Sequence, residues 1–297
     1  MRALRTLLNG IIDYAGLFPP ASLSMTDAVT NYAHYLQSHD RWALARFIVP
    51  VSRLAEFSDT VHSLPPDLRN QPWRLSALIG QDVQADVQTI ETFNARFSCA
   101  PRSLSIDTIE LKATSVEAIH ALNLPASLTA FVEIPIAPNP EPLIEAIKRK
   151  GICAKVRTGG VTLDAFPAPH DLARFIFLCA KHQTPFKATA GLHHPIRASY
   201  RLTYAPDSPC GTMFGFLNVF LASAFAFCGM SETTLAELIS ETDIATISFN
   251  QDSIQWRTHA ISLSLVEEAR TRFALAFGSC SFEEPMQDLK NQQLLLE

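Results

Sequence analysis

The chain has no marked excess of charge of either sign. Its 297 residues carry 24 lysines and arginines against 29 aspartates and glutamates, which gives a formal net charge of -5. The chain therefore lacks the excess of positive charge that is typical of nucleic-acid-binding proteins. It also lacks a long basic run of the kind that binds an anionic membrane surface. We therefore expect neither nucleic acid nor a membrane among its partners.

Paired cysteine motifs are also missing. The six cysteines are scattered, with no C-x-x-C pair: Cys99, Cys153, Cys179, Cys210, Cys228 and Cys280. Such spacing argues against a structural zinc site built from cysteines, and the N-terminus lacks the pattern of a signal peptide. These features predict free thiols in a reducing compartment, and hence a cytoplasmic protein.

One uncharged apolar run, Met213 to Met230, approaches the length that spans a bilayer. Asn218 and Ser223 lie in its middle, and neither flank is basic. These features favour a buried helix or a subunit interface over a membrane span. The chain is expected to form a homo-oligomer.

Glycine-rich nucleotide motifs and nucleophile motifs are absent as well. No G-x-G-x-x-G follows the first predicted strand, and neither a Walker A nor a G-x-S-x-G sequence occurs. What the chain does contain is a regular alternation of strand and helix patterns. Strands are predicted at residues 10–18, 44–50, 73–80, 104–112, 128–136, 152–158, 185–191 and 244–250. Helical patterns fill the intervals, and the last one runs from about residue 258 to 277.

Eight strand–helix units predict an α/β fold, and their number favours a single-domain (β/α)8 TIM-like barrel. A doubly wound open sheet is the competing fold, but it normally needs fewer strands. We expect the barrel to span residues 1–277, with residues 278–297 as a C-terminal tail that packs on the barrel or on a partner. The connection at 195–210 lacks helical period, so we expect a loop over the barrel mouth.

Two lysines stand on successive predicted strands, Lys155 in 152–158 and Lys187 in 185–191. Because positions i and i+2 share a face of a strand, the side chain of Lys155 lies on the same face as that of Arg157, and Lys187 on the same face as Thr189. Charges on a strand that is buried on both sides are costly unless they have partners or a chemical role. Active sites of such barrels lie at the C-terminal ends of the strands, so we expect chemistry on this face.

The lysines suit nucleophilic addition to a carbonyl. Burial and a nearby cation lower the pKa of an amine and so free its lone pair. Adjacent strands lie about 4.8 Å apart, so each lysine could supply the cation for the other. The sequence leaves open which of the two reacts. It also leaves open a structural ion pair of either lysine with Glu133 inside the barrel.

The segments AKVRTGG (154–160) and FKATAGL (186–192) resemble the lysine motifs of class I aldolases of the deoxyribose-phosphate aldolase type. The resemblance is confined to these two segments. It implies that Lys155 on the sixth strand forms a Schiff base and that Lys187 on the seventh tunes it. The predicted eighth strand ends in SFNQDS, where that family has a phosphate cradle rich in glycine and serine.

The other polar residues complete this hypothesis. Glu133 or Asp13 moves protons, His193 is a candidate general acid or base, and Arg157 clamps an anionic group. The candidate catalytic residues are Lys155, Lys187, Glu133, Asp13 and His193. The candidate substrate-binding residues are Arg157, Thr158, Gly159, Thr189, His194 and Asn250. An ordinary turn at Thr158–Gly159, a turn cap at Asp13 and an ion pair of Arg157 are the structural alternatives.

A metal-dependent enzyme is the second hypothesis. His193 and His194 with Asp13, Glu133 and Asn250 resemble the arrangement in metal-dependent lyases of the HMG-CoA lyase type, whose histidines come as H-x-H. Adjacent histidines on an extended chain point apart, so we expect at most one of them to bind metal. In this hypothesis a divalent metal is the cofactor, whereas the Schiff-base hypothesis needs none.

The preferred function is a lyase that acts on a small anionic carbonyl metabolite through a lysine Schiff base. The metal-dependent alternative is a lyase, isomerase or hydrolase centred on His193 and His194. A third alternative is a non-catalytic barrel subunit that binds a partner through the apolar helix at 213–230. It predicts ordinary lysine pKa values, or both lysines held in ion pairs.

Overall fold

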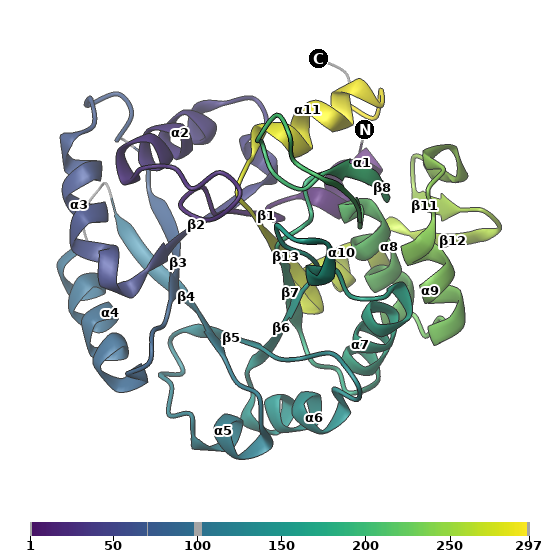
Figure 1. Ribbon diagram of the computed structural model, residues 1–297, viewed down its shortest axis with the longest axis horizontal. Coiled ribbons are helices and arrows are strands. Elements are labelled where there is room, and N and C mark those ends of the chain that lie inside the picture. The colour runs from purple at the N-terminus through teal and green to yellow at the C-terminus, as the bar shows by residue number, and fades with distance from the viewer. Residues whose placement is uncertain (1, 70, 98–102, 296–297) are drawn as a thin grey trace.

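Eight parallel strands close into a barrel in the order β1-β13-β7-β6-β5-β4-β3-β2, inside a ring of helices (Figure 1). The computed structural model describes residues 2–69, 71–97 and 103–295, so Cys99 lies outside the described residues. The barrel strands are β1 (Ile12–Tyr14), β2 (Leu44–Pro50), β3 (Trp73–Leu78), β4 (Leu104–Lys112), β5 (Thr129–Glu133), β6 (Cys153–Arg157), β7 (Phe186–Thr189) and β13 (Ala274–Ser279). The predicted TIM-like (β/α)8 fold in a single domain is confirmed.

Helices follow the barrel strands and cover the outside of the barrel. They are α2 (Met25–Gln37), α3 (Leu54–Ser63), α4 (Val83–Phe97), α5 (Val116–Ala121), α6 (Glu141–Lys150), α7 (Pro169–Lys181), α8 (Phe216–Phe227) and α11 (Glu283–Asn291), with α1 (Arg2–Leu8) ahead of the first strand. Local sequence explains their ends. The Ser24 side chain accepts a hydrogen bond from the backbone N–H of Asp27 at the start of α2, and Gly151 ends α6 with a φ of 72°.

The eighth barrel strand is β13, so its predicted position at 244–250 is wrong. That segment instead contains β10 (Ile247–Phe249), which pairs with β11 (Ser253–Trp256). β11 pairs in turn with β12 (His259–Ser262), and the three strands form an antiparallel sheet outside the barrel. The predicted helix at 258–277 shortens to α10 (Leu263–Arg272). An inserted unit, α9 (Glu232–Ser240) with the small sheet, breaks the strand–helix alternation on which the prediction relied.

The predicted boundary between barrel and tail is also wrong, because residue 277 lies inside β13. The segment after it supplies the eighth barrel helix, α11. Phe282, Met286 and Leu289 of this segment are 2%, 2% and 1% exposed, so they belong to the hydrophobic core. Residues 278–295 are therefore a part of the barrel.

The apolar run at 213–230 forms α8, which is buried along its length within a single chain. Its polar residues have partners: the Asn218 side chain accepts a hydrogen bond from the Arg197 backbone N–H and donates to the carbonyls of Leu238 and Glu241. The helix is core, and it leaves no exposed apolar face for a partner. Within 2–69, 71–97 and 103–295, no helix is both long and apolar enough to cross a bilayer.

The connection predicted as a loop at 195–210 begins an antiparallel hairpin, with β8 (Ala198–Arg201) paired to β9 (Cys210–Met213). Tyr204 lies between the two strands, and its hydroxyl is 3.2 Å from a carboxylate oxygen of Glu284 in α11. The hairpin after β7 therefore contacts the helix that follows β13.

Helix α11 offers a direct test of the corrected boundary. Leu289→Ala removes a buried side chain and should lower the free energy of unfolding by about 2–5 kcal/mol. Gln287→Ala on the same helix removes an exposed side chain and should change it by at most about 0.5 kcal/mol. Urea unfolding of both variants measures the difference. Equal, small effects would mean that α11 is a dispensable appendage.

Candidate active site

The register of the barrel strands brings the predicted lysines together. Lys155 of β6 is opposite Lys187 of β7, and Glu133 of β5 is opposite Lys155. On the other face of β6, Ala154 and Val156 are fully buried in the hydrophobic core. The alternation therefore directs both lysines to the inside of the barrel.

Inside the barrel, charged side chains form a row of alternating sign. Lys187 Nζ lies 2.5 Å from Asp13 Oδ2 and 2.7 Å from Glu110 Oε1. Lys155 Nζ lies 2.9 Å from Glu110 Oε2 and 3.0 Å from Glu133 Oε2, and Arg157 Nε is 3.3 Å from Glu133 Oε1. We call this row the ionic ladder: Asp13, Lys187, Glu110, Lys155, Glu133 and Arg157. Its first five members are between 0% and 9% exposed, so nearly all of it is removed from water.

A glycine lies on the strand between Lys187 and Asp13. Strand β13 lies between β7 and β1, and its Gly278 pairs with Thr189 on one side and Asp13 on the other. A Cβ atom at Gly278 would lie 3.2 Å from Thr189 Oγ1 and 3.3 Å from Ile48 Cδ1, so a larger residue there would crowd these two side chains.

Glu110 separates the two lysines electrostatically. Burial acts to raise the pKa of Glu110, but Lys155 and Lys187 outweigh it and hold that pKa well below its ordinary value. Burial acts to lower the pKa of Lys155, but Glu110 and Glu133 outweigh it and hold that pKa above its ordinary value. The expectation that a neighbouring lysine depresses this pKa is therefore wrong for Lys155, because carboxylates lie between the ammonium groups.

A cavity of about 280 Å³ opens at the C-terminal ends of the barrel strands. This main cavity is lined by residues that include Glu110, Lys155, Arg157, Thr189, His193 and Gly278. Lys187 is not among the lining residues and is 0% exposed. A ligand in the main cavity therefore meets one lysine, Lys155.

The two lysines also differ in how firmly they are held. Lys187 donates hydrogen bonds to Asp13 and Glu110 at 2.5 and 2.7 Å. Lys155 makes ion pairs, and Oε2 of Glu133 has no hydrogen-bond partner among the described residues although it lies 3.0 Å from Lys155 Nζ. Lys155 is thus held by less directional contacts than Lys187. It lies where the ladder meets the main cavity.

Two predicted substrate-binding residues have structural contacts instead. The Thr158 hydroxyl donates to the Ala190 carbonyl at 2.5 Å, and its backbone N–H donates to the Thr189 carbonyl. A Cβ atom at Gly159 would lie 3.0 Å from the Cα atom of Gly191, so the two glycines allow the loops after β6 and β7 to pack closely. Neither Thr158 nor Gly159 lines the main cavity.

The adjacent histidines contact different carboxylates of α11, as expected for side chains that point apart. His193 Nδ1 lies 3.2 Å from Glu284 Oε2, and His193 lines the main cavity. His194 Nδ1 lies 2.6 Å from Asp288 Oδ2, and its ring stacks on Tyr200 at a centroid distance of 3.5 Å. His193 thus faces the site, whereas His194 is held outside it.

Asn250 does not belong to the barrel mouth. It follows β10 in the small antiparallel sheet, and its backbone N–H donates to the Ser253 carbonyl. Its predicted role depended on the misplaced eighth strand, so the structure removes it from the candidate site.

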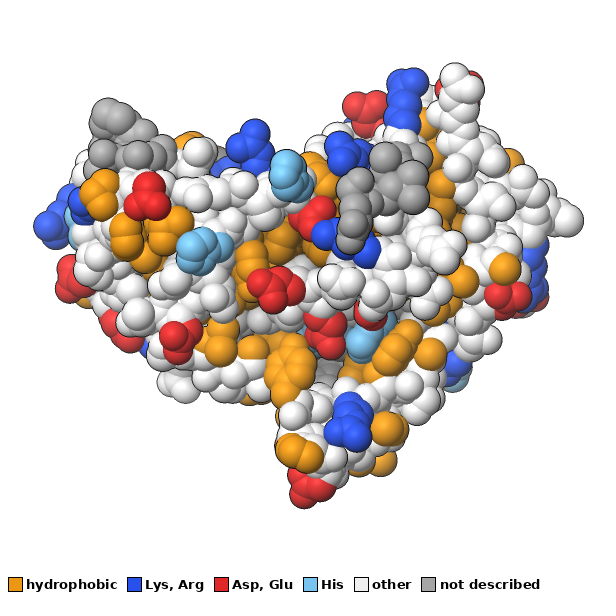
Figure 2. All heavy atoms as spheres, turned by 90° about the horizontal axis from the view of Figure 1, so that it is seen from above, with side chains coloured by type: hydrophobic (Ala, Val, Ile, Leu, Met, Phe, Trp, Pro, Cys, Tyr) orange, Lys and Arg blue, Asp and Glu red, His pale blue; other side chains and the backbone are white. Residues whose placement is uncertain are grey.

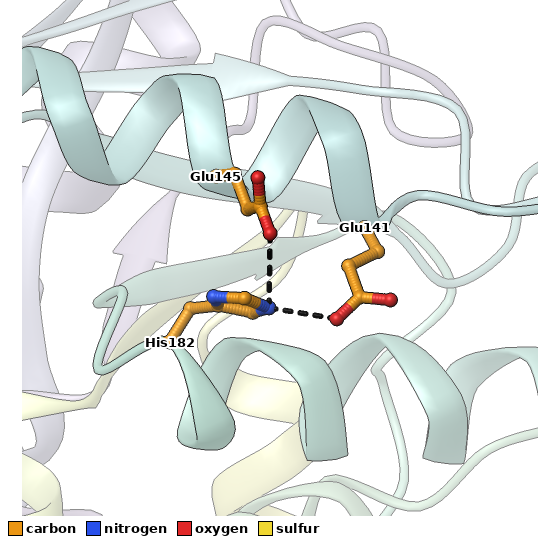
Figure 3. Close-up of side chains that lie close together, drawn as sticks. All are labelled: Glu141, Glu145 and His182. Carbon is orange, nitrogen blue, oxygen red and sulfur yellow. Dashed lines mark hydrogen bonds and ion pairs between the residues drawn. The ribbon is translucent and has the colours of Figure 1, made fainter.

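Candidate metal donors converge elsewhere in the molecule. Over the described ranges, a single group of three His, Cys, Asp or Glu donors lies close enough to share an ion: Glu141, Glu145 and His182 (Figure 3). His182 Nε2 lies 2.9 Å from Oε1 of Glu141 and 4.0 Å from Oε1 of Glu145. This group belongs to α6 and the end of α7, on the outside of the barrel. Asp13 and Glu133, the carboxylates of the metal hypothesis, are instead paired with ladder lysines.

Sequence reasoning missed two residues of the site. Glu110 was visible as a carboxylate on an apolar predicted strand, but nothing local indicated that it bridges both lysines. Cys280 follows the last predicted helix, so the sequence favours a buried thiol over a nucleophile there. The residue is 5% exposed, but it lines the main cavity, with its Sγ 3.7 Å from the Tyr204 hydroxyl. The true eighth strand runs into Gly278-Ser279-Cys280-Ser281, not into SFNQDS.

Outside the cavity the surface shows no dominant charge on the face drawn in Figure 2. Acidic and basic side chains are interspersed there with hydrophobic ones, and neither sign gathers into a large patch. The concentrated charge of this protein is inside the barrel, where water does not screen it.

The acid stability of the protein tests the ladder. The pKa of Glu110 is lowered in the folded state, so only the unfolded state binds a proton near pH 4.3. Stability from this carboxylate is therefore present above about pH 4.5 and is lost as the pH falls toward the folded-state pKa. Glu110→Gln should lower the free energy of unfolding at pH 7 by about 3–5 kcal/mol. Below pH 5 the free energy of unfolding of this variant should decrease less steeply with falling pH than that of the wild type.

Urea unfolding between about pH 3 and pH 7 makes this measurement. Glu237→Gln, which changes an exposed carboxylate on α9, is the matched control and should keep the slope of the wild type. An unchanged slope in Glu110→Gln would show that the buried carboxylate is not charged in the folded protein.

No protein-family model matches the chain, and no curated protein or solved structure gives a significant match. The barrel is a fold common among enzymes, but many different reactions share it. Conclusions about function therefore depend on the residues of the site itself.

Proposed function

We propose that the protein is a lyase that cleaves a small anionic β-hydroxy carbonyl compound through a Schiff base on Lys155. One observation supports this choice above the others: Lys155 alone of the two ladder lysines lines the main cavity. It shares that cavity with Arg157 and His193, which offer an anion-binding group and a proton-transfer group. The chemistry requires no cofactor.

The charge of the site favours an anionic substrate. The ladder and Lys112, whose Nζ is 3.4 Å from Glu133, together hold three carboxylates and four cationic groups. The Arg157 side chain is 47% exposed and lines the cavity, so part of its guanidinium is free to bind a ligand. A carboxylate or phosphate can take two hydrogen bonds from such a group.

The reaction begins with a proton transfer, because Lys155 is held as an ammonium ion. Glu133 Oε2 lies 3.0 Å away and has no hydrogen-bond partner among the described residues, so we assign it as the acceptor. The neutral amine then adds to the substrate carbonyl carbon, Glu133 returns the proton to the oxygen that leaves as water, and the nitrogen keeps one proton, which gives a protonated imine. Lys187 keeps its ion pairs with Asp13 and Glu110 during this step and does not contact the substrate.

His193 acts in the cleavage that follows. It takes the proton of the β-hydroxyl group, the bond between the α and β carbons breaks, and its electron pair moves into the protonated imine. The products are an aldehyde and an enamine on Lys155. His193 returns its proton to the enamine carbon, and water then hydrolyses the imine to release the ketone and restore the lysine. Glu284, 3.2 Å from His193, orients the ring for both transfers.

The non-catalytic hypothesis predicted both lysines in ion pairs, and both do make them. Ion pairing alone therefore does not separate a catalytic ladder from a structural one. The chemical reactivity of Lys155 does, because a purely structural lysine has no need to face a cavity.

Borohydride trapping tests the proposal. Incubation with acetaldehyde, acetone or pyruvate, followed by reduction, should add the corresponding mass to the peptide that contains Lys155. Lys155→Met should remove this adduct, whereas Lys181→Met, which replaces an exposed lysine on α7, should keep it. Peptide mass spectrometry locates the added mass. Repeated absence of an adduct on Lys155 in the folded wild type, with every carbonyl, would refute the Schiff base.

The pH dependence of trapping follows from the raised pKa of Lys155. Only the neutral amine adds to a carbonyl, and its fraction grows about tenfold per pH unit below the pKa. The initial rate of adduct formation should therefore rise through pH 7–10 in parallel with that of free N-acetyl-lysine, whose pKa is about 10.4. A plateau near neutral pH would show instead that the pKa of Lys155 is depressed.

A further inference from the structure

A second cavity lies beside the main one and meets it at the reactive lysine. Its volume is about 520 Å³, and it shares Leu78, Glu110 and Lys155 with the main cavity. We call it the side cavity. It opens between the loops that follow β3 and β4, and its lining includes neither His193 nor Arg157.

The two cavities differ in chemistry. The lining of the side cavity includes five aliphatic residues: Leu78, Ile79, Val83, Leu111 and Leu122. Its polar groups are those of Gln81, Lys112 and the shared Glu110 and Lys155. The main cavity also has apolar walls, such as Phe18 and Ile48, but it alone has Arg157, Thr189 and His193. The anion-binding and proton-transfer groups therefore lie in the main cavity, whereas the side cavity offers aliphatic surface beyond Lys155.

We infer that the substrate is a β-hydroxy ketone whose apolar substituent occupies the side cavity, while its hydroxyl-bearing, anionic part occupies the main cavity. This inference rests on the proposed Schiff base. The imine carbon must lie at Lys155 Nζ, where the cavities meet, so its two substituents extend in two directions. An aldehyde donor would place only a hydrogen atom toward the side cavity and would leave it empty.

This assignment agrees with the cleavage chemistry. The hydroxyl group that loses its proton lies on the same side of Lys155 as His193, the base that takes it. The anionic group lies on the side of Arg157. The released aldehyde leaves through the main cavity, and the enamine that remains on Lys155 keeps its apolar chain against Leu78 and Leu122.

Competition between two neutral ketones tests the inference. Acetone and 2-heptanone present the same methyl ketone to Lys155, but 2-heptanone adds four methylene groups that the side cavity can bury. Each buried methylene favours binding, so borohydride trapping from equal concentrations should give at least about tenfold more 2-heptanone adduct on Lys155. Mass spectrometry of the Lys155 peptide reads both adducts in one sample.

Variants that fill the side cavity should abolish this preference. Leu122→Trp and Val83→Trp place indole rings from two different elements, the C-terminal end of α5 and the first residue of α4. Circular dichroism and urea unfolding check that each variant is folded. In either variant the ratio of 2-heptanone to acetone adduct should fall to about that seen with free N-acetyl-lysine. Leu265→Trp, an exposed leucine on α10, is the matched control and should keep the ratio of the wild type.

The outcomes separate the inference from the proposed function. Adducts on Lys155 without a preference for 2-heptanone, or a preference that survives in both folded cavity variants, would overturn the side-cavity assignment and leave the Schiff base standing. No adduct on Lys155 with either ketone or with acetaldehyde would overturn both.

Discussion

The interior of the barrel is organised by one constraint: buried charges must be paired. Five ladder members are almost entirely removed from water, and an unpaired ion in such a place costs several kcal/mol. Their partners come from β1, β4, β5, β6 and β7, so the ladder exists only when these strands have closed in the observed register. The same pairing that stabilises the closed barrel also fixes the position of Lys155.

The ladder has an enclosed end and an open end, and this asymmetry is the basis of the functional proposal. At the enclosed end Lys187 makes short hydrogen bonds to two carboxylates and does not line the main cavity. At the open end Lys155 and Arg157 line the main cavity. A buried ladder keeps charge near the site without water, where electrostatic interactions with a substrate are stronger. The cost is that Lys155 begins as an ammonium ion and must lose a proton before it reacts.

Much of this arrangement was predictable from the sequence, and the rest was not for identifiable reasons. Seven of the eight barrel strands and the inward direction of Lys155 and Lys187 follow from local alternation of apolar and polar residues. The eighth strand was predicted at the wrong position because an insertion breaks the alternation of strands and helices. The same error included Asn250 in the candidate site and left Cys280 out of it. The role of Glu110 and the pKa of Lys155 depend on contacts between distant strands, which no local pattern encodes.

The charge state of Lys155, with and without a ketone, tests the central claim most directly. Its side-chain ¹³Cε signals can be assigned with Lys155→Arg and Lys187→Arg and followed by NMR as the pH is raised. The account predicts that Lys155 of the free protein loses its charge at a higher pH than an exposed lysine, because its pKa is raised, and that an added ketone moves the Lys155 signal alone to the position of an imine. A Lys155 signal that no ketone moves, or movement of the Lys187 signal instead, would contradict it.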